Sequence, residues 1–225
     1  MSVKHLIPKN ADLFDFSHSV AGVLLDPETY PWESLDAIAD FIRKVGPTLD
    51  PALFENRGND IYIARSARIA PTALINGPCL IDENAEIRHC AFIRGSAIVG
   101  KDAVVGNSCE LKNCLLFDNV QVPHFNYVGD SILGYRSHMG AGAVTSNVKS
   151  DKTLVTVKAA DEQIETGRKK FGALLGDLVE VGCNSVLCPG TIIGRETNVY
   201  PLSRVRGVIP DHSIFKGKNN MIPKH

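Results

Sequence analysis

Bulky apolar residues recur at every sixth position through the first half of the chain. The series is Ile63, Ile69, Ile75, Ile81, Ile87, Ile93, Val99, Val105, Leu111 and Phe117. Small residues follow four positions after most of these, at Ala67, Ala73, Cys79, Ala85, Ala91, Ala97, Ala103 and Cys109. A period of six matches neither the 3.6 of a helix nor the 2 of a simple strand. The pattern predicts an all-β solenoid whose triangular coils, about 18 residues each, place large side chains inside and small ones at the corners.

The series resumes later in the chain as Leu175, Val181, Leu187, Ile193, Val199 and Val205. The polar segment 146–170 between the two runs has no such period, and we expect it to be an insertion loop that leaves the coil. The stretch 123-PHFNYVGDSILG-134 also breaks the register, since Val128 follows Phe117 by 11 positions instead of 12. A one-residue slip re-aims nearby side chains, as bulges do beside active sites.

The region before the repeats has a different pattern. Apolar residues at helical spacing, with a proline at the start and a glycine at the end, are Pro31, Leu35, Ile38, Ile42, Val45 and Gly46. They predict a helix near 31–45, which we expect either to cover one open edge of the solenoid as a cap or, as the preferred alternative, to be a plain packing helix. The expected organisation is an N-terminal segment at 1–58, a solenoid at 59–212 with the insertion near 146–170, and a tail at 213–225.

Composition narrows the class of protein. The chain has 225 residues, a formal net charge of −1 and a pI of about 6.6, so it has no general attraction for nucleic acid or acidic membranes. No apolar stretch approaches the roughly 18 residues that span a bilayer, and the N-terminus does not resemble a secretion signal. The six cysteines form no CxxC pair. We therefore expect a cytoplasmic protein with reduced cysteines.

Several segments carry a family resemblance. The hexads resemble the left-handed parallel β-helix of hexapeptide-repeat transferases. The segments 94-RGSAIVGKDAVVGNSCELK-112, 124-HFNYVGDS-131 and 140-GAG-142, with the asparagine at 147, resemble the acetyltransferase half of the bifunctional bacterial enzyme that makes UDP-N-acetylglucosamine. The amino-acid sequence of 124–131 is still more similar to that of the archaeal sugar-1-phosphate nucleotidylyltransferases with a C-terminal β-helix. The resemblance extends over about 94–205.

This resemblance implies an activity. The expected function is N-acetyltransfer from acetyl-CoA to a hexosamine 1-phosphate, with glucosamine 1-phosphate as the first candidate acceptor and galactosamine 1-phosphate as the second. The family's GxGTRM nucleotide-binding signature is missing, which implies a stand-alone acetyltransferase without uridylyl transfer. The resemblance also implies a homotrimer with acetyl-CoA in the groove between subunits. No metal, nucleic acid or membrane partner is expected.

Two cations should form a phosphate site. Arg94 and Lys112 each follow an inward apolar residue and are 18 positions apart, so they should stack as neighbours in successive coils. Adjacent cations repel unless an anion lies between them, and a phosphate is the obvious anion. The alternative is that both side chains are solvated and splayed apart. The family's sugar-phosphate-binding Arg and Lys match these two positions.

His124 is the candidate general base, because an imidazole can accept the proton that an attacking amine must lose. It matches the family's catalytic histidine, although an isolated histidine is more often structural. The resemblance implies that Tyr127 and Asn147 contact the sugar or orient the reacting groups. Lys152 matches a lysine that reaches the phosphate, and Lys149 competes for that role.

The resemblance also implies two cofactor contacts. Ala141, within the 140-GAG-142 turn, matches a backbone contact to the acyl group, and Cys183 occupies a position where a serine helps to bind CoA. His138 stands where relatives have asparagine, and Val148 replaces a tyrosine, so the identity of the sugar stays open. The basic run 168–170 is expected to be a solvated surface.

Three alternatives stay open. A zinc enzyme such as the γ-type carbonic anhydrases shares this solenoid, but His89 and His124 are too few for a three-histidine site. A non-catalytic relative would bind a sugar phosphate or a partner protein without turnover. An acetyltransferase for a different sugar acceptor, amine or hydroxyl, would use the same histidine.

Overall fold

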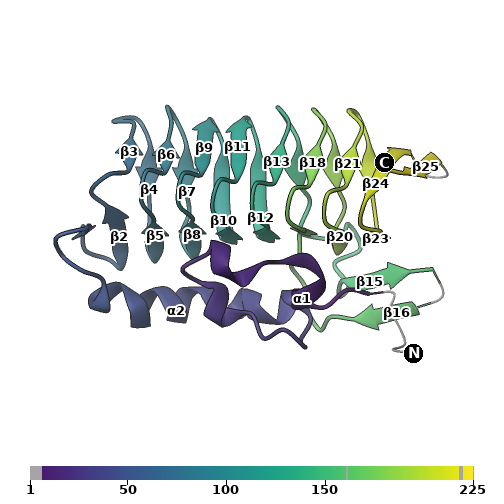
Figure 1. The fold of residues 1–225 in the computed structure, drawn as a ribbon, viewed down its shortest axis with the longest axis horizontal. Coiled ribbons are helices and arrows are strands. Elements are labelled where there is room, and N and C mark those ends of the chain that lie inside the picture. Colours follow the sequence, from purple (N-terminus) through teal and green to yellow (C-terminus); the bar gives the residue numbers. More distant parts are fainter. Residues whose placement is uncertain (1–6, 161, 218–219, 225) are drawn as a thin grey trace.

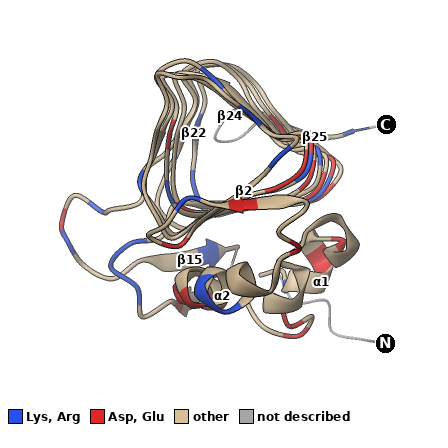
Figure 2. Cartoon of the chain, turned by 90° about the vertical axis from the view of Figure 1, so that its left-hand side faces the viewer, with Lys and Arg blue, Asp and Glu red and all other residues tan. Residues whose placement is uncertain are grey.

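The computed structural model describes residues 7–160, 162–217 and 220–224, most of which form a parallel β-solenoid. Seen along its axis, the coil is a triangle with three flat faces, and helices lie beneath one of them (Figure 2). Each coil contributes one short strand to each face, and successive coils pair in parallel. The predicted fold is confirmed.

The strands are grouped here by face. Face 1 contains β2 (Ile61–Ala64), β5 (Cys79–Ile81), β8 (Ala97–Val99), the second halves of β10 (Glu110–Leu116) and β12 (Tyr127–Leu133), β17 (Ala173–Leu175), β20 (Thr191–Ile193) and β23 (Val208–Ile209). Face 2 contains β3 (Arg68–Ile69), β6 (Glu86–Ile87), β9 (Val104–Asn107), β11 (Gln121–His124), β13 (His138–Met139), β18 (Glu180–Val181), β21 (Asn198–Val199) and β24 (Ser213–Gly217). Face 3 contains β4 (Leu74–Ile75), β7 (Phe92–Ile93), the first halves of β10 and β12, β14 (Val144–Thr145), β19 (Val186–Leu187) and β22 (Arg204–Val205).

The predicted series of large residues lines the interior. Ile81, Ile93 and Val99 are completely buried, and the small residues at the corners, such as Ala85 and Ala97, are buried as well. All six cysteines are free thiols. Burial raises the pKa of Cys79 to about 12, which keeps this thiol protonated and makes it a packing residue.

The register slips earlier than the sequence predicted. Leu111 pairs with Ile93, 18 positions back, whereas Cys114 pairs with Ala97, 17 positions back. One residue is therefore missing from the corner that contains Lys112, and the following coil keeps the shorter corner. The slip does not lie in the stretch around His124, because the pairing of β11 with β9 is continuous.

Phe117 is accordingly not part of the interior row, and this assignment from the sequence was wrong. Leu116 pairs with Val99 and takes the inward position. Phe117 turns outward at the next corner, where its ring stacks on Phe14 at 5.2 Å between centroids. The aromatic ring stays fully buried because the N-terminal segment covers it.

Face 1 is apolar on both of its sides. Its outward residues Leu80, Ile98, Leu115 and Ile132 are at most 1% exposed, as completely buried as the inward row. The N-terminal segment covers them (Figures 1 and 2). This segment comprises α1 (Asn10–Leu13), η1 (Phe16–His18), η2 (Gly22–Leu24), η3 (Pro31–Asp36), α2 (Ile38–Val45) and η4 (Gly46–Thr48).

The helix predicted near 31–45 exists as η3 followed by α2. It is a plain packing helix, the preferred alternative, and not a cap over an open edge. It runs along the side of the solenoid and packs on β5, β8 and β10 (Figure 1). Burial of the outward row of face 1 explains this position, since the end of a solenoid offers less apolar surface. Antiparallel strands pair at the two ends instead, namely β1 (Phe54–Asn56) on β2 and β25 (Asn220–Pro223) on β24.

The predicted insertion leaves the coil after β14, at the same corner that is one residue short in the two preceding coils. It contains an antiparallel hairpin, β15 (Thr156–Ala159) and β16 (Glu162–Glu165), and β15 packs beside β23. The chain re-enters the solenoid at β17, where Leu174 pairs with Ile132. None of the helices in the described part of the chain is long and apolar enough to cross a membrane.

Candidate functional site

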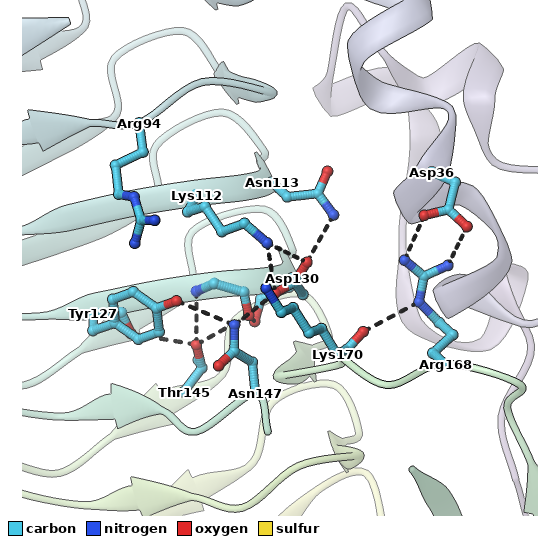
Figure 3. Close-up of polar contacts among 12 residues, drawn as sticks. Asp36, Arg94, Lys112, Asn113, Tyr127, Asp130, Thr145, Asn147, Arg168 and Lys170 are labelled. Carbon is cyan, nitrogen blue, oxygen red and sulfur yellow. Dashed lines mark hydrogen bonds and ion pairs between the residues drawn. The ribbon is translucent and has the colours of Figure 1, made fainter. Parts of the chain in front are cut away.

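A polar cluster occupies the corner between faces 3 and 1, and its centre is the carboxylate of Asp130 (Figure 3). Lys112 donates to both of its oxygens at 3.0 and 3.1 Å. Asn113 donates to one oxygen at 3.0 Å, and Asn147 to the other at 2.6 Å. Asp130 is 2% exposed, so a buried carboxylate here is stabilised by an ammonium and two amides. We call this set, with Tyr127, the Lys112 corner.

The shortened turns explain how these side chains meet. Asn113 and Asp130 have positive φ values of 48° and 50°, the left-handed conformation that lets the chain turn within two residues. Asparagine and aspartate tolerate this conformation better than most residues. The two corners stack in register, and Asn147 begins the insertion above them.

Arg94 and Lys112 stack as predicted, but each has a carboxylate partner. Arg94 donates to Glu110 at 2.7 Å, and Lys112 pairs with Asp130. Glu110 raises the pKa of the Arg94 guanidinium by accepting this hydrogen bond. The repulsion that called for an external anion is therefore offset within the protein. Sequence reasoning missed both partners.

Tyr127 belongs to the same cluster. The Tyr127 ring lies along face 3 over Gly129. Its hydroxyl therefore lies close to Asn147 and accepts a hydrogen bond from the Asn147 amide at 3.1 Å. Partial burial, helped by the charge of Asp130, raises the pKa of this phenol. Tyr127 therefore keeps its proton at neutral pH and can donate it in a hydrogen bond to a ligand. The predicted residues Lys112, Tyr127 and Asn147 are thus brought together through Asp130.

His124 lies at the opposite edge of face 3, the corner between faces 2 and 3. Its side chain is exposed. The backbone is fixed by the buried Asn126, whose side-chain oxygen accepts from the His124 N–H at 3.1 Å. The Asn126 amide donates to the carbonyls of Gly140 and Ala143 at 2.9 and 3.0 Å. Asn126, which the sequence analysis did not single out, therefore holds the histidine strand and the 140–142 turn together.

The two predicted cofactor residues continue this edge toward the C-terminus. Gly142 donates its backbone N–H to the carbonyl of His124 at 3.0 Å, and the Ala141 carbonyl accepts from Asn184 at 2.9 Å. Cys183 precedes Asn184 and is exposed. His124, Ala141 and Cys183 therefore form one line on three successive coils, separated from the Lys112 corner by the width of face 3. We call this line the His124 edge.

A cleft of about 480 Å³ opens on the other side of the Lys112 corner, between the solenoid and α2. Arg168, from the end of the insertion, donates to both oxygens of Asp36 at 2.7 Å across this cleft (Figure 3). The expectation that the run 168–170 is fully solvated is wrong for Arg168, whose side chain is only 14% exposed. Lys152 lies in an exposed turn of the insertion and does not line the cleft.

Two further histidines have polar partners outside these groups. His138 Nδ1 lies 2.8 Å from the carboxylate of Glu180 on face 2. His89 Nδ1 lies 2.6 Å from the hydroxyl of Thr72, at the same corner as His124 but two coils earlier. The described residues contain no group of three or more side chains arranged to hold a metal ion.

The fold and these corner residues together define a hexapeptide-repeat β-helix protein, as the sequence resemblance indicated. More narrowly, the chain belongs to the GMPPB C-terminal domain family, whose model matches residues 75–209.

Similar proteins are found among curated sequences. A bifunctional sugar-1-phosphate nucleotidylyltransferase/acetyltransferase of Sulfurisphaera tokodaii is 33% identical over 109 residues, which are 48% of this chain and 27% of that protein. The bifunctional protein GlmU of Methanococcus aeolicus is 30% identical over 212 residues, 86% of this chain and 47% of the relative. The chain thus spans about half the length or less of these relatives.

Solved structures show lower similarity to this chain. The acetyltransferase domain of PglB from Neisseria gonorrhoeae is 15% identical, with a TM-score of 0.36, and the match covers 83% of this chain and 67% of that domain. A perosamine N-acetyltransferase from Caulobacter crescentus, solved with CoA and GDP-perosamine, is 16% identical with a TM-score of 0.27; the match covers 72% of this chain and 55% of that one.

Proposed function

We propose that this chain is an acetyl-CoA-dependent N-acetyltransferase that acts on a hexosamine 1-phosphate, with glucosamine 1-phosphate as the first candidate and galactosamine 1-phosphate as the second. The observation that carries the proposal is the layout of face 3. An exposed histidine stands beside a glycine-flanked turn at one edge, and cations with hydrogen-bonding side chains stand at the other. Its relatives include a protein named as an acetyltransferase.

His124 is the proposed general base. The amine nitrogen of the sugar attacks the thioester carbonyl, the imidazole accepts the proton that nitrogen loses, and the carbon–sulfur bond then breaks to release CoA as a thiol. The proton can return from the imidazolium to the leaving sulfur, which balances the transfer. Asn126 supports this role because it holds the backbone N–H of His124 and ties it to the carbonyl of Gly140 in the next coil.

The turn at Ala141 is the proposed acyl site. Gly140, Gly142 and Ala143 donate their backbone N–H groups to carbonyls within the solenoid, whereas the Ala141 N–H has no backbone acceptor among the described residues. That N–H can donate to the oxyanion formed when the thioester is attacked. Cys183, one coil further on, is the proposed next contact of CoA along this edge.

The sugar is proposed to lie across face 3, against Tyr127. The Tyr127 hydroxyl and the Asn147 amide offer hydrogen bonds to sugar hydroxyls, and Arg94 and Lys112 keep free N–H donors for a phosphate because each uses only part of its donors on its carboxylate. We assign no ligand contact to Lys152.

A homotrimer in the cytoplasm is part of the proposal. Exposed apolar side chains gather on face 3 and the His124 edge, namely Leu74, Phe125, Val186 and Leu202, which are 39–80% exposed. Such a patch favours burial between subunits. A trimer would place this apolar surface and the His124 edge in an intersubunit groove that could hold acetyl-CoA.

The test is release of the CoA thiol from acetyl-CoA with glucosamine 1-phosphate, galactosamine 1-phosphate and unphosphorylated glucosamine. We expect turnover on a phosphorylated acceptor and a loss of roughly 100-fold or more in His124→Ala, the usual contribution of a general base. His89→Ala is the matched control, because this residue occupies the same corner two coils earlier and should leave the rate unchanged.

Each result has a distinct meaning. No turnover with any of the three sugars would reject the proposed acceptors and favour the non-catalytic or different-acceptor alternatives. If the His124→Ala variant turns over as fast as the wild type, the proposed reaction stands, but His124 is not its general base.

A further inference from the structure

The N-terminal segment lies before the region that the family model matches, yet one of its aromatic residues reaches the insertion. Trp32 belongs to η3, which packs on β10 and β12. Trp32 is 3% exposed, and its ring centroid lies 5.8 Å from that of Phe171. Tyr30 stacks on Trp32 at 4.6 Å, so the indole contacts two aromatic rings. Trp32 therefore connects the N-terminal segment to the end of the insertion.

Phe171 closes the base of the insertion against Asn147. Its backbone N–H donates to the Asn147 carbonyl at 3.0 Å, and the next N–H, that of Gly172, donates to the Asp130 carbonyl at 2.8 Å. The Phe171 side chain is completely buried. We call the paired residues Asn147 and Phe171 the neck of the insertion. The neck joins the insertion to the coil at a residue whose side chain belongs to the Lys112 corner.

The Asn147 side chain has one polar atom left for a ligand. Its amide nitrogen donates to the Tyr127 hydroxyl at 3.1 Å and to the Asp130 carboxylate at 2.6 Å, which uses both of its N–H donors. The amide oxygen is left to accept a hydrogen bond from a ligand. Because the side chain is short, the position of this oxygen follows the Asn147 backbone, which the neck holds.

η3 holds the end of the insertion by two contacts of different kinds. The polar contact is the ion pair between Arg168 and Asp36, whose carboxylate is 81% exposed. The apolar contact is that of Trp32 with Phe171, and both side chains are buried. An ion pair with a solvated partner contributes little to stability, whereas the burial of two large aromatic side chains contributes several times more. Trp32 is therefore the stronger of the two attachments.

We infer that Trp32 is a positioning residue for Asn147. Trp32 holds Phe171, Phe171 holds the Asn147 backbone, and Asn147 presents its amide oxygen to the acceptor sugar. The inference rests on the proposed function for the sugar, but the bracing of the neck does not depend on acetyl transfer. Trp32 acts through the neck and not by contact with the acceptor. The N-terminal segment, besides covering face 1, is thereby a part of the acceptor site.

Hydrogen–deuterium exchange of the full-length protein tests the bracing without any substrate. We expect the Phe171 and Gly172 amides to exchange roughly tenfold faster in Trp32→Leu, because the neck opens more often once its aromatic cover is removed. Trp32→Phe keeps a ring at this position and should exchange like the wild type. Phe14→Leu is the matched control, because Phe14 is 2% exposed and stacks its ring on the solenoid at another corner, on Phe117. Trp32→Met replaces Trp32→Leu if circular dichroism shows that the leucine variant does not fold.

Steady-state kinetics with glucosamine 1-phosphate test whether the brace acts through Asn147. We expect Trp32→Leu to raise the KM for this sugar roughly threefold to tenfold, the range of one weakened hydrogen bond, with kcat nearly unchanged. Trp32→Phe should restore the wild-type KM, and Phe14→Leu should leave it unchanged. In an Asn147→Ala background, Trp32→Leu should have no further effect, since a residue that acts through Asn147 then has nothing to position.

The inference is overturned if the neck amides exchange equally fast in Trp32→Leu and the wild type. It is also overturned if Phe14→Leu accelerates them to the same extent, because the effect would then be a general loss of packing. A rise in KM that persists in full in the Asn147→Ala background contradicts it as well. If the wild type turns over no amino sugar but the neck exchanges as expected, the proposed activity fails and the bracing of Asn147 stands. If the wild type acetylates glucosamine 1-phosphate and Trp32→Leu retains its KM, the inference fails and the proposed activity stands.

Discussion

At the scale of single residues, Asp130 organises the Lys112 corner. Its carboxylate accepts hydrogen bonds from Lys112, Asn113 and Asn147, and the side chain is almost completely buried. A buried carboxylate with three donors fixes all three of them. The orientation of Lys112 and Asn147 toward a ligand therefore depends on a residue that is itself almost completely buried.

We predict that Asp130→Ala lowers the free energy of unfolding by about 1–3 kcal/mol, because it leaves a partly buried ammonium and two amides without their acceptor. Urea denaturation followed by circular dichroism measures the change. Glu110→Ala is the comparison, since it removes the partner of the more exposed Arg94 and should cost much less. Equal losses in the two variants would argue against the special role of Asp130.

The sequence predicted the positions of Lys112, Tyr127 and Asn147 at the site but not what connects them. Asp130 follows Lys112 by 18 positions, and Glu110 follows Arg94 by 16, so both partners come from the next coil. The repeat length of the coil could have revealed both carboxylates, because a carboxylate one coil away from a cation is its spatial neighbour. Asn126 gave no such signal, because its role depends on the backbone of another coil.

At the scale of elements, the insertion and the N-terminal segment are joined by Arg168 and Asp36. The hydrogen bonds from Arg168 lower the pKa of the Asp36 carboxyl below its ordinary 3.8, against the smaller opposing effect of burial. A carboxyl whose pKa is depressed by folding stabilises the folded state when it is ionised. This contribution is present above pH 3.8 and is lost as the pH falls through the folded-state value.

We therefore predict that Asp36→Asn reduces stability at neutral pH by at most about 1 kcal/mol, after allowance for solvent screening of an exposed carboxylate. The difference from the wild type should shrink as the pH falls below 3.8. Thermal unfolding at a series of pH values measures it. A difference that does not depend on pH would show that the charge of Asp36 is not what stabilises the contact.

The element pattern was predictable in part. The period of six predicted the solenoid, the row of residues in its interior and the position of the insertion. The one-residue slip was placed too late because Phe117 is as apolar as a true interior residue, and only strand pairing distinguishes it from Leu116. The period of six did not indicate which surface η3 and α2 cover, because the outward row of face 1 repeats only once per coil, at Leu80 and Ile98 for example.

At the scale of the whole molecule, the N-terminal segment serves as a second layer over face 1. We predict that a protein lacking the first 50 residues exposes the apolar row represented by Leu80, Ile98 and Ile132, binds a hydrophobic dye and self-associates. Dye fluorescence and light scattering measure both effects. Val23→Ser, at an 86% exposed position of the same segment, should change neither. A truncated protein that stays monodisperse and dye-free would contradict this account of face 1.

The contacts of this layer also determine the order in which the molecule can be completed during synthesis. Coils pair with neighbours 17 or 18 positions away, so they can form one after another as the chain emerges. The N-terminal segment, in contrast, accepts a hydrogen bond at Leu13 from Asp177, and Asp177 accepts one from Asp15 across 162 positions. The part of this segment around Leu13 and Asp15 can therefore reach its final place only after the coil that contains Asp177 has been made.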